Sequence, residues 1–211
     1  MSSLFEPILL LVLFTFISVL LFRDKSKKVD NLLLLILLLS CANELTSKWL
    51  RHYGIPIGVL VTSYVIMTNL LWLLILKQTS SNKKLISGAV TLFLLFSLVN
   101  IIFFDGLKVF NYYTFTIGAF LYLFLFIYDN FNEMKKENFD YFYSDQYLVI
   151  AAPVLFFIGF SFIFSFRSKA LDNTCIFPQL RLYDFISYLV NTVYYTMLMY
   201  YIYRSKKRSN A

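Results

Sequence analysis

Seven long hydrophobic runs, separated by short polar stretches, set the pattern of this chain. Each run is close to the length of about 20 helical residues that a bilayer core requires. The pattern predicts an all-α integral membrane protein in which a single domain, residues 1–211, forms one bundle of seven transmembrane helices. The predicted spans are residues 5–22, 31–50, 57–76, 85–104, 109–128, 147–166 and 182–203.

The first run has the features of an uncleaved anchor. Glu6 precedes it in place of a basic segment, and the basic run 23–28 follows it without a small-residue cleavage site. We therefore expect the N-terminus on the outer side of the membrane.

The distribution of basic residues predicts the orientation, because cytoplasmic loops carry the excess of Lys and Arg. With an outer N-terminus and seven spans, thirteen of the 19 basic residues fall on the cytoplasmic side. These thirteen are Arg23, Lys25, Lys27, Lys28, Lys77, Lys83, Lys84, Lys135, Lys136, Arg204, Lys206, Lys207 and Arg208. The C-terminus is therefore predicted to be cytoplasmic.

Composition supports the membrane assignment and argues against a soluble domain, a nucleic-acid-binding protein and a paired-cysteine site. The chain is 59% hydrophobic and only 15% charged, against roughly a quarter charged in soluble domains. The net charge of +7 arises from short loops and the C-terminus, as membrane topology requires, so we expect the lipid bilayer and no nucleic acid as a partner. Cys41 and Cys175 are too differently placed to indicate a redox or metal pair.

Polar residues interrupt the second span. Ser40, Glu44 and Lys48 are spaced four residues apart and share one helix face. Inserting a carboxylate at the middle of the bilayer costs about 2.5–3.5 kcal/mol. We therefore expect Glu44 to face protein or water and not lipid. Either the stripe is a structural ion pair that fixes helix rotation, or Glu44 lines a site for an outer small-molecule ligand or an ion path.

Further polar residues are predicted at a similar depth, among them Ser63 and Tyr64 in the third span, Tyr112, Tyr113 and Thr114 in the fifth, and Asp184 in the seventh. Asn100 and Asp105 end the fourth span, and Asn111 opens the fifth. Facing inward, they would form an outward-facing polar vestibule with Glu44 at its floor. Asn111 as a helix cap and Asn100 as a hydrogen-bonding group between helices are the simpler alternatives.

The segment 129–146 is predicted to be a charged cytoplasmic loop. It holds five acids and two lysines at helical spacing, beside an aromatic face. We consider two interpretations, a solvated interfacial helix and a docking site for a cytoplasmic or membrane protein partner. The residues that would carry docking are Glu133, Lys135, Lys136, Glu137 and Asp140.

The sequence offers little catalytic chemistry. His52 is the single histidine and has no His or Cys partner at metal-ligand spacing. The chain has no glycine-rich phosphate motif and no nucleophile elbow. We therefore assign no catalytic residue, metal or cofactor, and leave open an intramembrane enzyme that uses Glu44, Lys48 and Asp105.

Around Glu44 and in the segments 95–100 (LFSLVN) and 105–114 (DGLKVFNYYT), the chain resembles a group of small, uncharacterised seven-helix inner-membrane proteins common in Bacteroidetes. The likeness covers about residues 40–165 in layout. It implies a stand-alone, receptor-like membrane module and carries no activity onto these residues.

Together these observations favour a non-enzymatic, multi-pass sensor or receptor of a bacterial inner membrane, which relays a signal from the outer polar residues to the cytoplasmic loop. Two alternatives stay open. One is a small secondary transporter or channel component in which Glu44 carries protons or cations, and the other is a structural subunit of a membrane complex.

Overall fold

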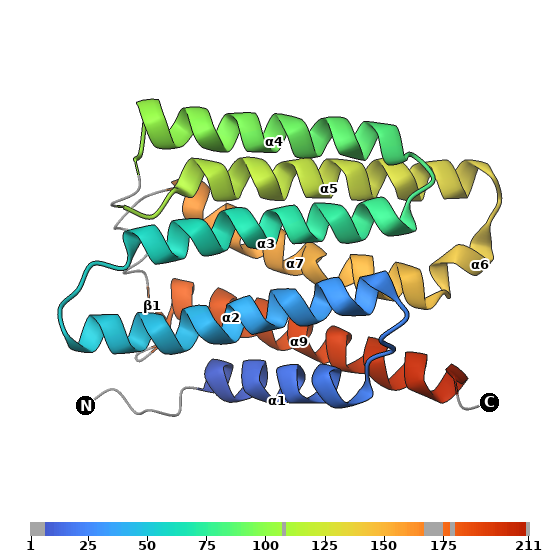
Figure 1. The fold of residues 1–211 in the computed structure, drawn as a ribbon, viewed down its shortest axis with the longest axis horizontal. Coiled ribbons are helices and arrows are strands. Elements are labelled where there is room, and N and C mark those ends of the chain that lie inside the picture. Colours follow the sequence, from blue (N-terminus) through green and yellow to red (C-terminus); the bar gives the residue numbers. More distant parts are fainter. Residues whose placement is uncertain (1–6, 107–108, 167–174, 178–179, 210–211) are drawn as a thin grey trace.

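The structure is a computed structural model that describes residues 7–106, 109–166, 175–177 and 180–209. These residues form a bundle of long helices (Figure 1). The helices are α1 (Pro7–Phe22), α2 (Lys28–His52), α3 (Gly58–Thr79), α4 (Lys83–Phe103), α5 (Tyr112–Lys135), the short α6 (Phe139–Phe142), α7 (Asp145–Phe166) and α9 (Leu182–Ser209). Two short strands, β1 (Cys175–Phe177) and β2 (Leu180–Arg181), pair antiparallel just before α9.

The long helices alternate in direction along the chain (Figure 1). As a result, the α1–α2, α3–α4 and α5–α7 connections and the end of α9 lie at one end of the bundle. We call this the basic end, because the thirteen basic residues that the sequence assigns to one side all lie there. The other end, where α2 ends and α3 begins, we call the far end.

Helix α3 is the central element of the bundle. It packs against α2, α4, α5 and α7, whereas α4 packs against α3 and α5 at the edge. Helix α9 packs against α7 and α1, and α1 also packs against α2. The helices therefore enclose a common interior, with α4 attached to one side of it.

The multi-pass helical character is confirmed, since five helices among the described residues are long and apolar enough to cross a membrane: α2, α3, α4, α5 and α7. Helix α1 is apolar but only 16 residues long. Helix α9 has 28 residues, but tyrosines and terminal basic residues make it more polar. The count of seven spans and the orientation therefore stay predictions.

Some boundaries differ from those the hydrophobic pattern predicts. Most predicted spans match a helix to within three residues, but α5 begins at Tyr112 and continues to Lys135, and α9 continues to Ser209. Both extensions are polar turns that prolong a helix beyond its apolar part, where hydropathy no longer signals it. Residues 129–135 therefore belong to α5, and the charged loop is shorter than predicted.

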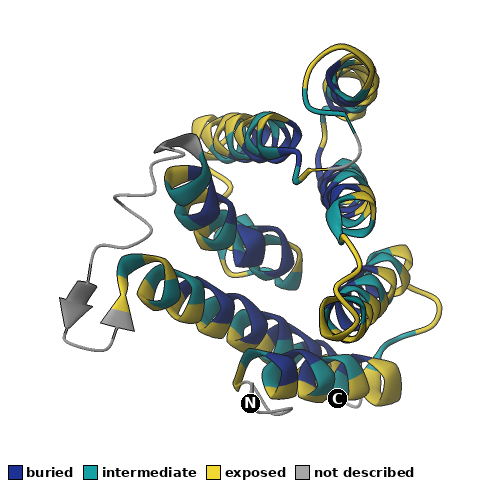
Figure 2. Cartoon of the chain, turned by 90° about the vertical axis from the view of Figure 1, so that its left-hand side faces the viewer, coloured by how far each residue is buried: buried dark blue, intermediate teal, exposed yellow. Residues whose placement is uncertain are grey.

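The outer surface of the bundle is apolar. Figure 2 shows buried residues turned toward the middle of the bundle and exposed ones turned outward. On α4 the outward residues include Leu92, Leu95 and Ile102, the last of which is 69% exposed. Large continuous apolar surfaces are rare on soluble monomers, so this exterior fits a lipid environment.

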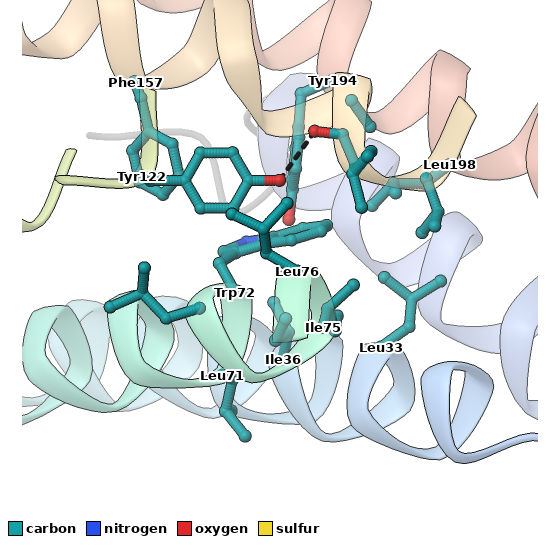
Figure 3. Close-up of a cluster of buried hydrophobic side chains, with 14 of the residues drawn as sticks. Leu33, Ile36, Leu71, Trp72, Ile75, Leu76, Tyr122, Phe157, Tyr194 and Leu198 are labelled. Atoms are coloured by element: carbon teal, nitrogen blue, oxygen red, sulfur yellow. Dashed lines mark hydrogen bonds between the residues drawn. The ribbon is translucent and has the colours of Figure 1, made fainter. Parts of the chain in front are cut away.

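The core is built around Trp72 of α3 (Figure 3). Its ring lies 6.2 Å from that of Tyr122 on α5 and 6.0 Å from that of Tyr194 on α9. The Tyr122 hydroxyl donates a 2.7 Å hydrogen bond to the Ile150 carbonyl of α7, drawn in Figure 3. The aromatic rings thus join α3, α5, α7 and α9, and the one polar atom of Tyr122 is satisfied inside the bundle.

Helices α3, α4 and α5 approach closely at Gly118. A Cβ atom there would lie 2.6 Å from Asn69 Oδ1 and 2.8 Å from Phe93 Cε2. Asn69 cannot move away freely, because its side-chain Nδ2 donates a 2.9 Å hydrogen bond to the Val65 carbonyl. Gly118 therefore sets the distance between α5 and its neighbours.

Gly118→Ala should lower the free energy of unfolding by about 1–3 kcal/mol, because the added methyl group overpacks this contact. Gly88→Ala on α4 is the matched control, since a Cβ there meets no atom within 4 Å. It should be neutral or stabilise by up to about 1 kcal/mol through reduced backbone freedom. Unfolding in mixed detergent micelles measures both variants, and equal effects would contradict the close approach.

Candidate functional site between α2, α3 and α9

A buried hydroxyl pair joins α2 to α3. Ser40 is 3% exposed, and its Oγ lies 3.0 Å from the Tyr64 hydroxyl oxygen. Ser40 also donates to the Ile36 carbonyl at 3.0 Å. Because a serine hydroxyl has one proton, that bond makes Tyr64 the donor to Ser40.

Helix α9 supplies a third hydroxyl. Tyr195 is 4% exposed and interacts with both Ser40 and Tyr64. Its ring lies 4.7 Å from that of Tyr194, which in turn contacts Trp72 at the core. Three helices therefore meet around one small polar group inside an apolar bundle.

Glu44 lies one helical turn beyond Ser40 along α2 and is partly buried. Its carboxylate interacts electrostatically with the hydroxyls of Tyr64 and Tyr195. Because Glu44 is also one turn from Ser40 and so lies on the same face of α2, we count it with the group around Ser40. Lys48, one turn further along, is also partly buried. We call Ser40, Glu44, Tyr64 and Tyr195 the α2 polar group.

Asn100, Asp105 and Asn111 come together in a second group at the far end. Asn100 Nδ2 donates to Asn111 Oδ1, to Thr114 Oγ1 at 3.1 Å and to Asp105 Oδ2 at 3.4 Å. Asn111 Oδ1 also accepts the Thr114 backbone N–H at 3.1 Å, so Asn111 is the N-cap of α5. Asn100 is 2% and Asn111 0% exposed. This group ties α4 to the start of α5.

The two groups lie on opposite sides of α3. Helix α2 packs against α3 and α1, and α4 packs against α3 and α5 (Figure 1). The structure therefore brings Ser40 and Glu44 together, and separately Asn100, Asp105 and Asn111. Their role in binding a ligand or an ion stays a prediction.

The predicted docking residues lie where α5 ends. Glu133 pairs with Lys136 at 2.6 Å and accepts a 2.7 Å hydrogen bond from the Asn138 side chain. Lys135 lies over the ring of Phe131, with Nζ 4.6 Å from its centroid. Glu137 follows the C-cap of α5 and is in the left-handed region, with φ 55°. Both Glu137 and Asp140 are exposed.

Tyr195 is the group member that sequence reasoning missed, because the tyrosines of the last span resembled an interfacial aromatic belt. In the structure Tyr194, Tyr195 and Tyr201 are 4% exposed, whereas Tyr200 and Tyr203 are 52% and 65% exposed. The buried positions of α9 include 191, 194, 195, 198, 201, 202 and 205, which share one helix face, and this periodicity was the available signal.

Comparisons with protein-family models, with curated proteins and with solved structures found no match to this chain. The resemblance to small seven-helix proteins of Bacteroidetes therefore stays a prediction.

Tyr64→Phe should lower the free energy of unfolding by about 0.5–1.5 kcal/mol, since it removes the hydrogen bond to Ser40. Tyr200→Phe on the exposed face of α9 is the control and should have no effect. A double-mutant cycle with Ser40→Ala isolates the pair. A coupling energy of zero would show that the two hydroxyls do not interact.

Proposed function

We propose that this chain is a non-enzymatic, receptor-like module of a bacterial inner membrane, which senses a small ligand or a membrane state through Glu44. One observation carries this proposal: Glu44 is partly buried one turn from Ser40 on α2, where its charge acts on the hydroxyls of Tyr64 on α3 and Tyr195 on α9. A charged group in such surroundings responds strongly to a neighbouring charge, because the local dielectric is low.

Helix α9 supports a relay from this group to the basic end. It is one continuous helix that carries Tyr195 at the α2 polar group and Tyr201 and Ser205 two to three turns further on. Tyr201 donates a 2.5 Å hydrogen bond to Asp30, and Ser205 accepts one of 2.9 Å from Lys27. A shift of α9 against α2 would therefore change contacts at both ends of the same helix pair.

The relay has a direct route to the segment 136–144. Arg204 of α9 donates to the Tyr143 carbonyl, and its Nε lies 2.9 Å from Asp145 at the start of α7. Phe139 and Tyr143 in this segment are 63% and 75% exposed. An exposed aromatic and acidic segment attached to a responsive helix is suited to docking a cytoplasmic or membrane protein partner.

Glu44→Gln tests the relay, because it removes the charge and keeps the shape. We expect backbone hydrogen exchange in residues 136–144 and in the last turns of α9 to rise about fivefold, since losing the charge that acts on Tyr195 would loosen α9 by about 1 kcal/mol. Asp105→Asn is the matched control at the same end of the bundle, across α3, and should leave exchange at the basic end unchanged.

Two results would contradict the proposal. One is a folded Glu44→Gln protein whose exchange at the basic end matches that of the parent. The other is uptake into proteoliposomes that depends on a proton gradient and is lost in Glu44→Gln, which would favour the transport alternative.

A further inference from the structure

A cavity of about 690 Å³ lies at the basic end, on the opposite side of the membrane-spanning region from Glu44. The starts of α2 and α7, the end of α3 and the last turns of α9 line it. Its volume lies within the range of about 300–1,000 Å³ that is typical of small-molecule sites.

The lining of this cavity is cationic. Lys27, Lys28 and Arg208 face a single acid, Asp145. That acid is already engaged, because its two carboxylate oxygens lie 2.9 Å from Arg204 Nε and 3.2 Å from Arg208 Nη1. The lining therefore has a surplus of positive charge that suits an anion.

One helix N-terminus, that of α2, adds to this positive character. Helix α2 begins at Lys28, and the side chain of its N-cap residue, Lys27, makes no capping hydrogen bond. Helix α7 begins at the same cavity, but Ser144 caps it by accepting the Tyr147 N–H at 3.0 Å, and Asp145 occupies its first turn. Helix N-termini carry partial positive charge and first-turn N–H donors, so they favour phosphate and similar anions.

Several lining groups are held in place from behind. The Lys27 ammonium donates to Ser205, which is 6% exposed, and Tyr201 is fixed by its hydrogen bond to Asp30. Asp30 is 1% exposed and also accepts the Asp24 N–H at 2.9 Å. These bonds tie the start of α2 to α9, so part of the cavity wall is organised before any ligand enters.

The packing of the helices decides from where a ligand can enter. Helix α2 packs against α3, α3 against α7 and α7 against α9, and α1 bridges α9 and α2. Every helix that lines the cavity therefore has packed neighbours on both of its sides. The cavity lies among the ends of these helices, so we take this end of the bundle as the entrance.

We propose that this cavity binds a small water-soluble molecule that carries a phosphate group. Arginine, two lysines and the uncapped amides at the start of α2 form a donor set that suits phosphate oxygens. The volume exceeds that of phosphate alone, so an organic part of the ligand occupies the remainder, against Val29 and Val149. This site is separate from the group around Glu44 and does not depend on it.

The test uses the full chain in phosphatidylcholine nanodiscs, with inorganic pyrophosphate as the probe at constant ionic strength. We expect a saturable rise in Tm in the parent protein. Lys28→Gln combined with Arg208→Gln should weaken the binding of pyrophosphate about tenfold or more. Lys83→Gln combined with Lys84→Gln removes the same charge at the basic end from residues outside the cavity, and should change affinity less than about twofold.

Gln78→Glu is a second test of the cavity, needed because the first variant could lose affinity through a folding defect. Gln78 lines the cavity on α3, and the substitution adds a negative charge without removing Arg208 from Asp145. It too should weaken binding about tenfold, by repulsion.

Three results would overturn the proposal. The first is the absence of saturation below about 10 mM pyrophosphate, and the second is an equal loss of affinity in the cavity and control variants. The third is that phosphatidylglycerol in the nanodiscs weakens the binding of pyrophosphate to the parent protein but not to the cavity variant. That result would assign the phosphate group to a lipid headgroup.

Discussion

The requirement that polar groups inside lipid find partners within the protein is the constraint on which this structure depends. Lipid around the apolar exterior offers no hydrogen-bond partners. Polar side chains within the membrane therefore have to lie between helices, where other protein groups can bond to them. Four buried hydrogen bonds join different elements: Ser40 to Tyr64, Asn100 to Asn111, Tyr122 to the Ile150 carbonyl, and Tyr201 to Asp30. Together with the aromatic packing around Trp72 they fix which helices are neighbours and how each is rotated.

The same constraint explains why two helices matter most for function. Helix α3 occupies the centre and separates the two polar groups of the far end. It also lies in close contact with α5, where Gly118 of α5 meets Asn69 of α3. Helix α9 is the element that reaches both ends, with Tyr195 in the α2 polar group and Tyr201 and Arg208 lining the cavity at the basic end. The proposed sensing group around Glu44 and the proposed phosphate site therefore lie toward opposite ends of α9. Because α9 is one continuous helix, a small shift at one end would move the other.

Hydrophobic patterning predicted the helices well, because each buried or lipid-facing run has the length of a bilayer core. It also placed Ser40 and Glu44 on one face and Asn100 near Asn111. It could not show that α3 stands between these groups, because neighbour relations depend on packing and not on sequence order. The cavity was invisible for the same reason, since Lys27, Gln78, Asp145 and Arg208 come from four distant segments. Asp30 gave no signal because it sits at the edge of an apolar run, where an acid is unremarkable at a helix start.

The account rests most directly on α1 and α9 crossing the membrane together with the five clearly apolar helices. Single cysteines at Ser26, Tyr53, Arg181 and Lys206, in a chain lacking Cys41 and Cys175, can be labelled with a membrane-impermeant maleimide from either side. Seven crossings predict that positions 26 and 206 react from one side, and positions 53, 181 and an N-terminal tag from the other. Reaction of positions 181 and 206 from the same side, or of the tag and position 26 from the same side, would contradict the account.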